Sequence, residues 1–314
     1  MTMSALTLIA GSGNPDLAGA IAVELGVRPA LCLIESFPDG ELHVDVHESV
    51  RGHDVFIVQP TGPPVADHLM ELLLLADACR RAGAARLTAV MPYFGYGRQD
   101  RRSQGREAVG ARLVADLVGI AGFASVVAVD LHTPALEACF DMPLEHLSAT
   151  TVLAKSIGPV AEDAIVVAPD LGAVRLAEQF SRKLSRPMAT IHKQRSGPGT
   201  VRVLDIVGRV EGRTPIIVDD MISTGGTVAA AVRALLGAGC RPDLTVVASH
   251  GLLVGSANAT LEQLPIGRLV TTDSVPVRAD LRLPIEVVSL APILAGVVGR
   301  LHRDESLSTL EALR

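Results

Sequence analysis

The stretch that decides the fold is Pro215-Ile216-Ile217-Val218-Asp219-Asp220-Met221-Ile222-Ser223-Thr224-Gly225-Gly226-Thr227. Its apolar start is typical of a buried strand, and the residues that follow, 228–236, favour a helix. A strand that turns through 223–227 into a helix aims backbone N–H groups and the positive helix end at one point, which suits a phosphate. Asp219 and Asp220 repel phosphate, so we expect them to hold hydroxyl groups or a hydrated cation beside it. The stretch therefore predicts a sugar-phosphate site.

On either side of this stretch, short apolar runs alternate with helical patterns. The expected strands are 6–10, 55–59, 87–91, 126–130, 164–168, 216–219, 244–249 and 269–272, and the expected helices are 67–82, 108–118, 173–184 and 228–236. This alternation predicts an α/β fold with parallel sheets that helices cover on both faces. We predict two doubly wound parallel-sheet domains, 1–146 and 147–314, and the last helix is a candidate to pack back on the first domain.

Composition excludes several classes of protein. The 314 residues are 48% hydrophobic and 20% charged, with a net charge of −6, so no overall basic field would attract nucleic acid or an anionic membrane. The four cysteines show no C-x-x-C spacing, which argues against zinc or a disulfide framework and fits a reducing cytoplasm. We expect no signal peptide and no membrane span.

Common nucleotide motifs are absent from the chain. Gly11-Ser12-Gly13 follows an expected strand, but Asp16 occupies the place of the third glycine of a dinucleotide fingerprint, and there is no P-loop pattern. Any nucleotide must be bound by other means.

A second segment combines aromatic, glycine and arginine residues: Pro92-Tyr93-Phe94-Gly95-Tyr96-Gly97-Arg98-Gln99-Asp100-Arg101-Arg102-Ser103. Aromatic residues make up 3% of the chain, so this concentration favours contact with a base or a phosphate. The alternative is a solvated basic loop that pairs with acidic neighbours.

Three shorter patterns each have a functional and a structural interpretation. The turn 36–41 displays an aromatic ring and two acids, although Pro-Asp-Gly is also an ordinary turn. His132 and Asp170 follow expected strand ends and could share a divalent cation, or be structural. Lys193 and Arg195 follow an expected strand, 188–191, on a loop that could close over a polyphosphate, or be merely solvated.

Together these segments resemble the ribose-phosphate diphosphokinase family, also called phosphoribosyl pyrophosphate synthetases. The likeness spans nearly the whole chain and rests on motifs in the family's order: Phe37-Pro38-Asp39-Gly40-Glu41, Val50-Arg51-Gly52, Pro92-Tyr93-Phe94-Gly95-Tyr96, Arg98-Gln99-Asp100-Arg101-Arg102, Asp130-Leu131-His132, Pro169-Asp170, Lys193-Gln194-Arg195 and Asp219-Asp220-Met221-Ile222.

The resemblance implies two phosphoribosyltransferase-like domains, the first on the ATP and metal side and the second on the ribose 5-phosphate side. It implies a homo-oligomer, dimer or hexamer, in which Phe37 and Glu41 reach the ATP site of a neighbouring subunit. The implied site residues are, for ATP, Phe37, Asp39, Glu41, Arg98, Gln99, Asp100 and Arg101; for Mg²⁺, His132 and Asp170; for ribose 5-phosphate, Asp219, Asp220, Ser223, Thr224, Gly225, Gly226 and Thr227; and for catalysis, Lys193 and Arg195 on a flexible loop.

The implied reaction transfers the diphosphoryl group of ATP to O1 of ribose 5-phosphate and releases AMP. Two alternatives stay open: a phosphoribosyltransferase, which would need one such domain and no Arg98-Gln99 segment, and a non-catalytic partner subunit. Ser223 stands where many members carry aspartate, and Gln194 where many carry arginine. The residues after Ser103 resemble a less regulated class, whereas 305–308 resemble the phosphate-regulated class.

Overall fold

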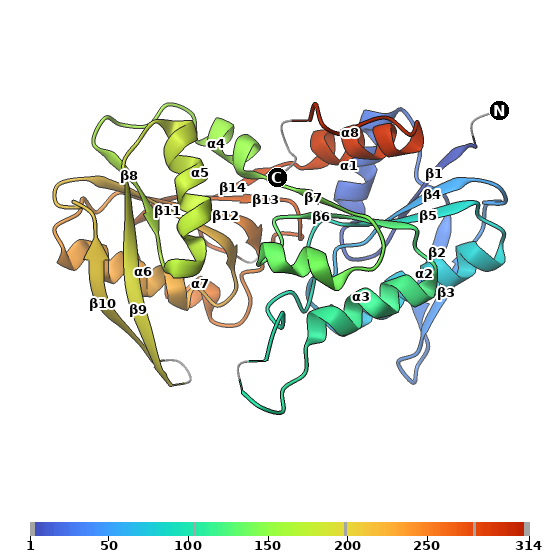
Figure 1. Cartoon of the computed structure of the whole chain (residues 1–314), viewed down its shortest axis with the longest axis horizontal. Coiled ribbons are helices and arrows are strands. Elements are labelled where there is room, and N and C mark those ends of the chain that lie inside the picture. Colours follow the sequence, from blue (N-terminus) through green and yellow to red (C-terminus); the bar gives the residue numbers. More distant parts are fainter. Residues whose placement is uncertain (1–3, 103, 198–199, 279–280, 311–314) are drawn as a thin grey trace. The chain divides into compact units, whose positions relative to one another are not determined.

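The structure of the chain, a computed structural model, describes residues 4–102, 104–197, 200–278 and 281–310. Contacts divide the chain into two units (Figure 1). Unit 1 comprises Met1–Ser148 with Ser289–Arg314, and unit 2 comprises Ala149–Val288. Each unit is built around a mainly parallel sheet with helices on both faces, which confirms the predicted α/β class.

Unit 1 contains a five-stranded parallel sheet in the order β1-β4-β5-β6-β7 and a separate antiparallel hairpin, β2-β3. Its elements are β1 (Leu6–Ala10), α1 (Pro15–Leu25), β2 (Cys32–Ser36), β3 (Leu42–Val46), β4 (Asp54–Val58), α2 (Val65–Arg81), β5 (Arg86–Met91), α3 (Gly110–Ala121), β6 (Ser125–Val129), the 3₁₀ turn η1 (Pro134–Cys139), β7 (Leu144–Leu147) and α8 (Ala291–His302).

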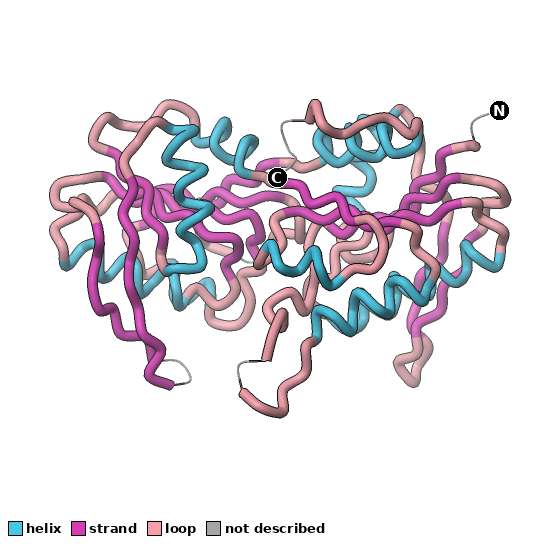
Figure 2. Tube along the Cα trace, in the orientation of Figure 1, coloured by secondary structure: helices cyan, strands magenta, loops and turns pink. Residues whose placement is uncertain are grey.

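Two helices cover each face of this sheet. In Figures 1 and 2, α2 and α3 lie on one face and α1 and α8 on the other. Every residue of β4 is buried, as the apolar run 55–58 predicts for all but its first residue, Asp54. The hairpin β2-β3 has no counterpart among the expected strands. Its inner residues, such as Ile34 and Val44, pack on the core beneath α2.

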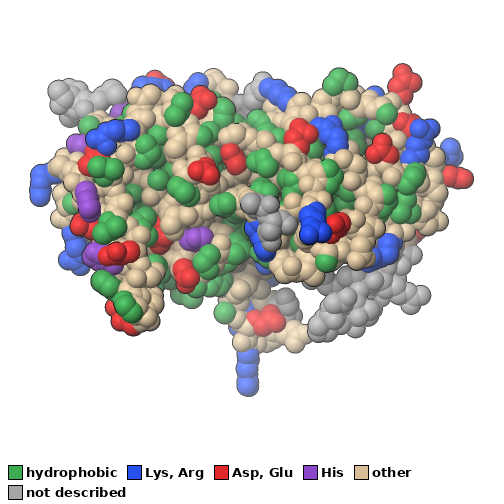
Figure 3. Space-filling view, turned by 180° about the vertical axis from the view of Figure 1, so that it is seen from behind, with side chains coloured by type: hydrophobic (Ala, Val, Ile, Leu, Met, Phe, Trp, Pro, Cys, Tyr) green, Lys and Arg blue, Asp and Glu red, His purple; other side chains and the backbone are tan. Residues whose placement is uncertain are grey.

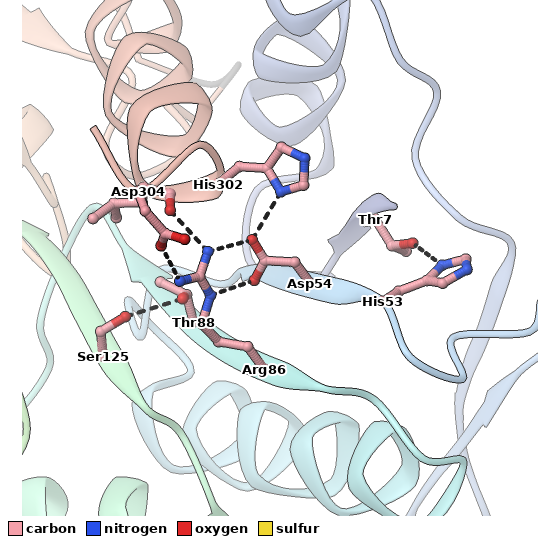
Figure 4. A network of polar contacts seen from close by, with 9 residues as sticks. Thr7, His53, Asp54, Arg86, Thr88, Ser125, His302 and Asp304 are labelled. Carbon is pink, nitrogen blue, oxygen red and sulfur yellow. Dashed lines mark hydrogen bonds and ion pairs between the residues drawn. The ribbon is translucent and has the colours of Figure 1, made fainter. Parts of the chain in front are cut away.

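The C-terminal helix α8 is tied to the start of two strands by a buried ion pair (Figure 4). Arg86 donates two hydrogen bonds to Asp54, Nε to Oδ1 at 2.8 Å and Nη2 to Oδ2 at 2.7 Å. From the end of α8, His302 Nδ1 lies 2.9 Å from Asp54 Oδ2, and Arg86 also contacts Asp304 and the Leu301 carbonyl oxygen, each at 2.8 Å. The side chain of Asp54 is 1% exposed, so these partners stabilise a carboxylate that water does not reach.

We expect Arg86→Met to lower the free energy of unfolding of unit 1 by about 3 kcal/mol, because it leaves a buried carboxylate without its cation. The measurement is the urea or thermal midpoint of the purified variant. Arg112→Met is the matched control, since Arg112 bridges Asp116 and Asp141 at the surface, where removal should matter little. Equal losses in the two variants would contradict the assigned role of the buried pair.

Unit 2 contains a seven-stranded sheet in the order β10-β9-β8-β11-β12-β13-β14, in which the β9-β10 pair is antiparallel and the other pairs are parallel. Its elements are α4 (Thr150–Ile157), β8 (Ala164–Ala168), the 3₁₀ turn η2 (Leu171–Ala173), α5 (Val174–Leu184), β9 (Met188–Gly197), β10 (Thr200–Val207), β11 (Thr214–Ile222), α6 (Gly226–Gly237), β12 (Leu244–Gly251), α7 (Ala257–Leu261), β13 (Ile266–Thr272) and β14 (Ile285–Val288).

Charged side chains of both signs lie on the surface, as expected for a chain without an overall basic field. On the face drawn in Figure 3, basic and acidic side chains are interspersed, and hydrophobic ones lie between them. The longest helix among the described residues is α2 with 17 residues, and none of the described helices is long and apolar enough to cross a membrane.

Candidate active site

The two adjacent carboxylates lie inside a strand of unit 2. Strand β11 was expected to end at residue 219, but it continues to Ile222, because residues 221 and 222 keep pairing with β12 as far as Gly251. Asp219 and Asp220 are both partly buried and lie near the carboxyl edge of the sheet, close enough for the Asp220 side chain to act on the Asp219 carboxyl. The Asp220 amide donates to Asp219 Oδ1 at 3.0 Å.

Negative charge is concentrated around Asp219. Burial raises the pKa of Asp219 well above its ordinary value, and the nearby charges of Asp220 and Asp170 raise it further. Because the residue keeps part of its surface exposed, solvent screens some of this repulsion. Hydroxyl donors or a cation would relieve it, as expected for a sugar or metal contact.

The phosphate cradle predicted at 223–227 is a turn that leads directly into α6. Gly225 precedes the helix with φ 78°, a left-handed conformation that glycine adopts without strain, and no side chain caps the helix start. A Cβ atom at Gly225 would lie 3.0 Å from Leu261 of α7. The amides of Leu253 and Val254 each donate at 3.0 Å to the carbonyl oxygens of Ile222 and Ser223, so the turn is held from the β12-α7 connection.

Asp170 has a structural role in addition to its expected metal role. Its Oδ1 accepts hydrogen bonds from the amides of Gly172 at 2.9 Å and Ala173 at 3.2 Å, which caps the turn η2. Within unit 2 it is a neighbour of Asp219, whose pKa its charge raises. The described residues contain no group of three His, Cys, Asp or Glu side chains arranged to hold a metal. His132 belongs to unit 1, so its sharing of a cation with Asp170 stays a prediction.

The segment that carries Lys193 and Arg195 is not a loop at the level of the backbone. Strand β9 continues through it to Gly197 and pairs with β10, with Lys193 opposite Val203 and Arg195 opposite Val201 (Figure 2). The expected end of the strand at residue 191 was therefore wrong, because the valines of β10 supply a pairing edge that the sequence of β9 does not reveal. The side chains of Lys193 and Arg195 lie outside the described part of the structure.

In unit 1, two of the three aromatic residues after β5 belong to the core. Tyr93 and Phe94 are each 5% exposed, and the ring of Phe94 lies 5.3 Å from that of Phe140. The interpretation of this aromatic concentration as a base contact is thus wrong for these two side chains. Tyr96 is half-buried and packs at the edge of the same core.

The polar residues that follow are accessible, with one exception. Arg98, Gln99 and Arg101 are exposed. Asp100 is mostly buried, and its Oδ2 accepts a hydrogen bond from Thr133 Oγ1 at 2.9 Å. Asp100 therefore joins this segment to the turn after β6. Sequence reasoning missed Thr133, since no pattern signals a contact across 33 residues.

The tip of the β2-β3 hairpin presents the predicted aromatic and acidic side chains. Phe37 is 46% exposed, and its ring lies 5.4 Å from that of His43. The carboxylate of Asp39 accepts from the Glu41 amide at 3.1 Å, and the Phe37 amide donates to the Glu41 carbonyl oxygen at 2.8 Å. Asp39 thus shapes the turn, while Phe37 and Glu41 face solvent at its end.

His132 lies at the carboxyl edge of the unit 1 sheet. It is exposed and lies two residues after Asp130, which directly follows β6, has φ 38° and is 1% exposed. The turn that carries His132 therefore contains a buried non-glycine residue in the left-handed region.

Comparison with known proteins identifies the family of this chain. Residues 6–122 match the family described as the N-terminal domain of ribose phosphate pyrophosphokinase, and residues 196–312 match the phosphoribosyl synthetase-associated domain. A ribose-phosphate pyrophosphokinase of Gloeobacter violaceus is 42% identical over 312 residues, which cover 97% of this chain and 92% of the relative. The chain belongs to the ribose-phosphate pyrophosphokinase family. The resemblance inferred from the motifs is thereby confirmed.

Other members of the ribose-phosphate pyrophosphokinase family are similar over the same length. The enzyme of Staphylococcus saprophyticus is 42% identical over 315 residues, covering 98% of this chain and 97% of the relative. The crystal structure of phosphoribosylpyrophosphate synthetase from Mycobacterium smegmatis superimposes with a TM-score of 0.90 at 40% identity, covering 96% of this chain and 100% of that one. The fold of the whole chain is therefore that of this family.

Proposed function

We propose that this chain transfers the diphosphoryl group of ATP to O1 of ribose 5-phosphate, giving 5-phosphoribosyl 1-diphosphate and AMP. The observation that carries the proposal is the 42% identity to a ribose-phosphate pyrophosphokinase over 97% of the chain. A phosphoribosyltransferase is disfavoured, because the likeness includes the first unit as well as the second.

The acceptor sugar would be held by unit 2. The turn 223–227 would take the 5-phosphate at the start of α6, and Asp219 and Asp220 would accept hydrogen bonds from ribose hydroxyl groups.

The nucleotide would be held by residues of unit 1. Arg98, Gln99 and Arg101 are exposed and offer donors to the phosphates and the base, whereas Asp100 positions the segment through Thr133. In the reaction a bond forms between O1 and the β-phosphorus, the bond between the β-phosphorus and the bridging oxygen to the α-phosphate breaks, and AMP leaves with that oxygen. The O1 proton passes to water. Lys193 and Arg195 would neutralise charge that develops on the transferred group.

We propose that the reaction uses Mg²⁺. Carboxylate oxygens are its preferred protein ligands, and besides burial the charges of Asp220 and Asp170 raise the pKa of Asp219, which is repulsion that a cation would relieve. His132 and Asp170 would hold the ion, which supplies electrostatic stabilisation of the phosphates.

We also propose a homo-oligomer, a dimer or hexamer, in the cytoplasm. The exposure of Phe37 at the hairpin tip suits a side chain that completes the ATP site of a neighbouring subunit. All four cysteines are free, which suits a reducing compartment.

The test is AMP formation by the purified chain with ATP, Mg²⁺ and ribose 5-phosphate, with and without inorganic phosphate and ADP. AMP that appears only when ribose 5-phosphate is present supports the proposal. Binding of ATP without AMP in every condition would favour a non-catalytic partner subunit. Reaction of 5-phosphoribosyl 1-diphosphate with a free base, without AMP formation from ATP, would favour a phosphoribosyltransferase.

A further inference from the structure

A strained turn carries His132 in unit 1. Asp130 adopts φ 38°, which L residues occupy only where the surrounding structure holds them. The Asp130 amide donates to the carbonyl oxygen of Leu147 on β7 at 2.9 Å, which fixes one side of the turn. The next amide, that of Leu131, must find an acceptor for the turn to keep this shape.

That acceptor is a buried histidine on the neighbouring strand. His146 lies on β7 opposite Ala128 of β6, and its side chain is 4% exposed. Its Nε2 accepts the hydrogen bond of the Leu131 amide at 3.0 Å, and its Nδ1 lies 2.6 Å from Oε1 of Glu137.

These two contacts determine where the imidazole proton lies. A backbone N–H can only donate, so Nε2 of His146 must carry no hydrogen. The ring is therefore neutral, with its single N–H on Nδ1 donating to Glu137. Glu137 selects the tautomer that lets His146 accept from Leu131.

We infer that His146, oriented by Glu137, is a positioning residue that holds the 130–132 turn and so sets the direction of His132 toward ATP and its metal. The inference rests on the proposed function, because that function gives His132 its role. Thr133, the residue after His132, donates a hydrogen bond to Asp100 of the ATP segment. The contact between His146 and the turn therefore affects the position of both His132 and that segment.

Substitutions that distinguish the role of Nε2 from the role of Nδ1 test this inference. The amide oxygen of His146→Gln can reach the place of Nε2, whereas that of His146→Asn reaches only the place of Nδ1. His146→Leu removes both. Glu137→Ala, at a side chain that is 51% exposed, leaves the ring in place but no longer selects its tautomer.

The first readout needs no turnover. Hydrogen–deuterium exchange of peptides across 127–136 should quicken in the Leu and Asn variants and stay close to wild type in the Gln variant. Calorimetric binding of ATP with Mg²⁺, without ribose 5-phosphate, should weaken by about tenfold in the Leu and Asn variants, since an unpaired buried amide weakens the turn. The exchange rate and the ATP affinity of Glu137→Ala should lie between those of wild type and those of the Leu variant.

Kinetics supply the second readout. We expect KM for ATP to rise with the binding constant, while KM for ribose 5-phosphate stays within about twofold of wild type. His302→Gln is the control, because His302 is also a largely inaccessible histidine that contacts a carboxylate, 12% exposed and at the opposite end of the strands. It should lower the unfolding midpoint and leave ATP affinity unchanged.

Wild-type ATP affinity and exchange in His146→Leu would overturn the inference, as would a Gln variant no better than Leu. If His302→Gln weakened ATP binding equally, the effect would be one of general stability, and the inference would fail. A chain that shows the expected pattern of exchange and ATP binding, yet forms no AMP, would refute the proposed function and leave the positioning role standing.

Discussion

Lys193→Ala is expected to lower turnover by on the order of 100-fold or more, with modest changes in the affinity for either substrate. The reason is that phosphoryl transfer depends on neutralising charge that develops only in the transition state. Initial rates of AMP formation at saturating ATP and ribose 5-phosphate measure the effect, and KM values separate it from binding. Near-normal turnover would remove Lys193 from the catalytic role.

Lys183→Ala is the matched control. Lys183 is exposed in the last turn of α5, so the substitution removes the same charge from the same unit without touching the site. Its turnover should equal that of wild type. A comparable loss in both variants would mean that net charge, and not the position of Lys193, decides the rate.

Asp219→Asn is expected to lower kcat/KM for ribose 5-phosphate by on the order of 100-fold and at the same time to stabilise the protein. The amide keeps the shape of the side chain but loses the charge that would accept hydroxyl hydrogen bonds or a cation. The stability gain follows from the raised pKa of Asp219, because the substitution removes a charge that burial disfavours and also relieves the repulsion from Asp220 and Asp170. Activity and unfolding midpoint should therefore move in opposite directions.

The pH dependence of this gain has a definite sign. Between the unfolded pKa of an aspartate, about 3.9, and the raised pKa of Asp219, the folded state binds more protons than the unfolded chain. Wild-type stability from this group is thus fully present below about pH 4 and is lost as pH rises through the folded pKa. The advantage of Asp219→Asn should grow with pH over this window and then level off.

Unfolding midpoints of wild type and variant across pH, without metal or substrate, check this prediction. Asp243→Asn serves as control, since Asp243 is exposed and its neutralisation relieves no buried charge. An Asp219→Asn variant less stable than wild type at neutral pH would contradict the assigned repulsion.

Much of the fold follows from local pattern. The strands Leu6–Ala10 and Ala164–Ala168 have the predicted bounds, because short apolar runs flanked by turn residues form buried strands of an α/β sheet. The strands missed include the β2-β3 hairpin and the extension of β9, each of which pairs with the next strand along the chain and not through a βαβ crossover. Residues 192–197 form a strand because they pair with β10, which follows almost directly in the chain, and the polar residues 192–195 hide this strand from a search for apolar runs.

The candidate site, too, has one part that the sequence predicted and another that only the tertiary structure showed. The acid pair and the cradle lie within one contiguous stretch, 215–227, whose chemistry depends on neighbours in sequence. The sequence by itself therefore predicted a sugar-phosphate site there, and with the other motifs it determined the family. Only the tertiary structure decided that Tyr93 and Phe94 are core residues, that Thr133 holds Asp100, and that His146 holds the turn before His132. Those contacts depend on which strands lie side by side and in which register, and register is set by packing across the whole sheet.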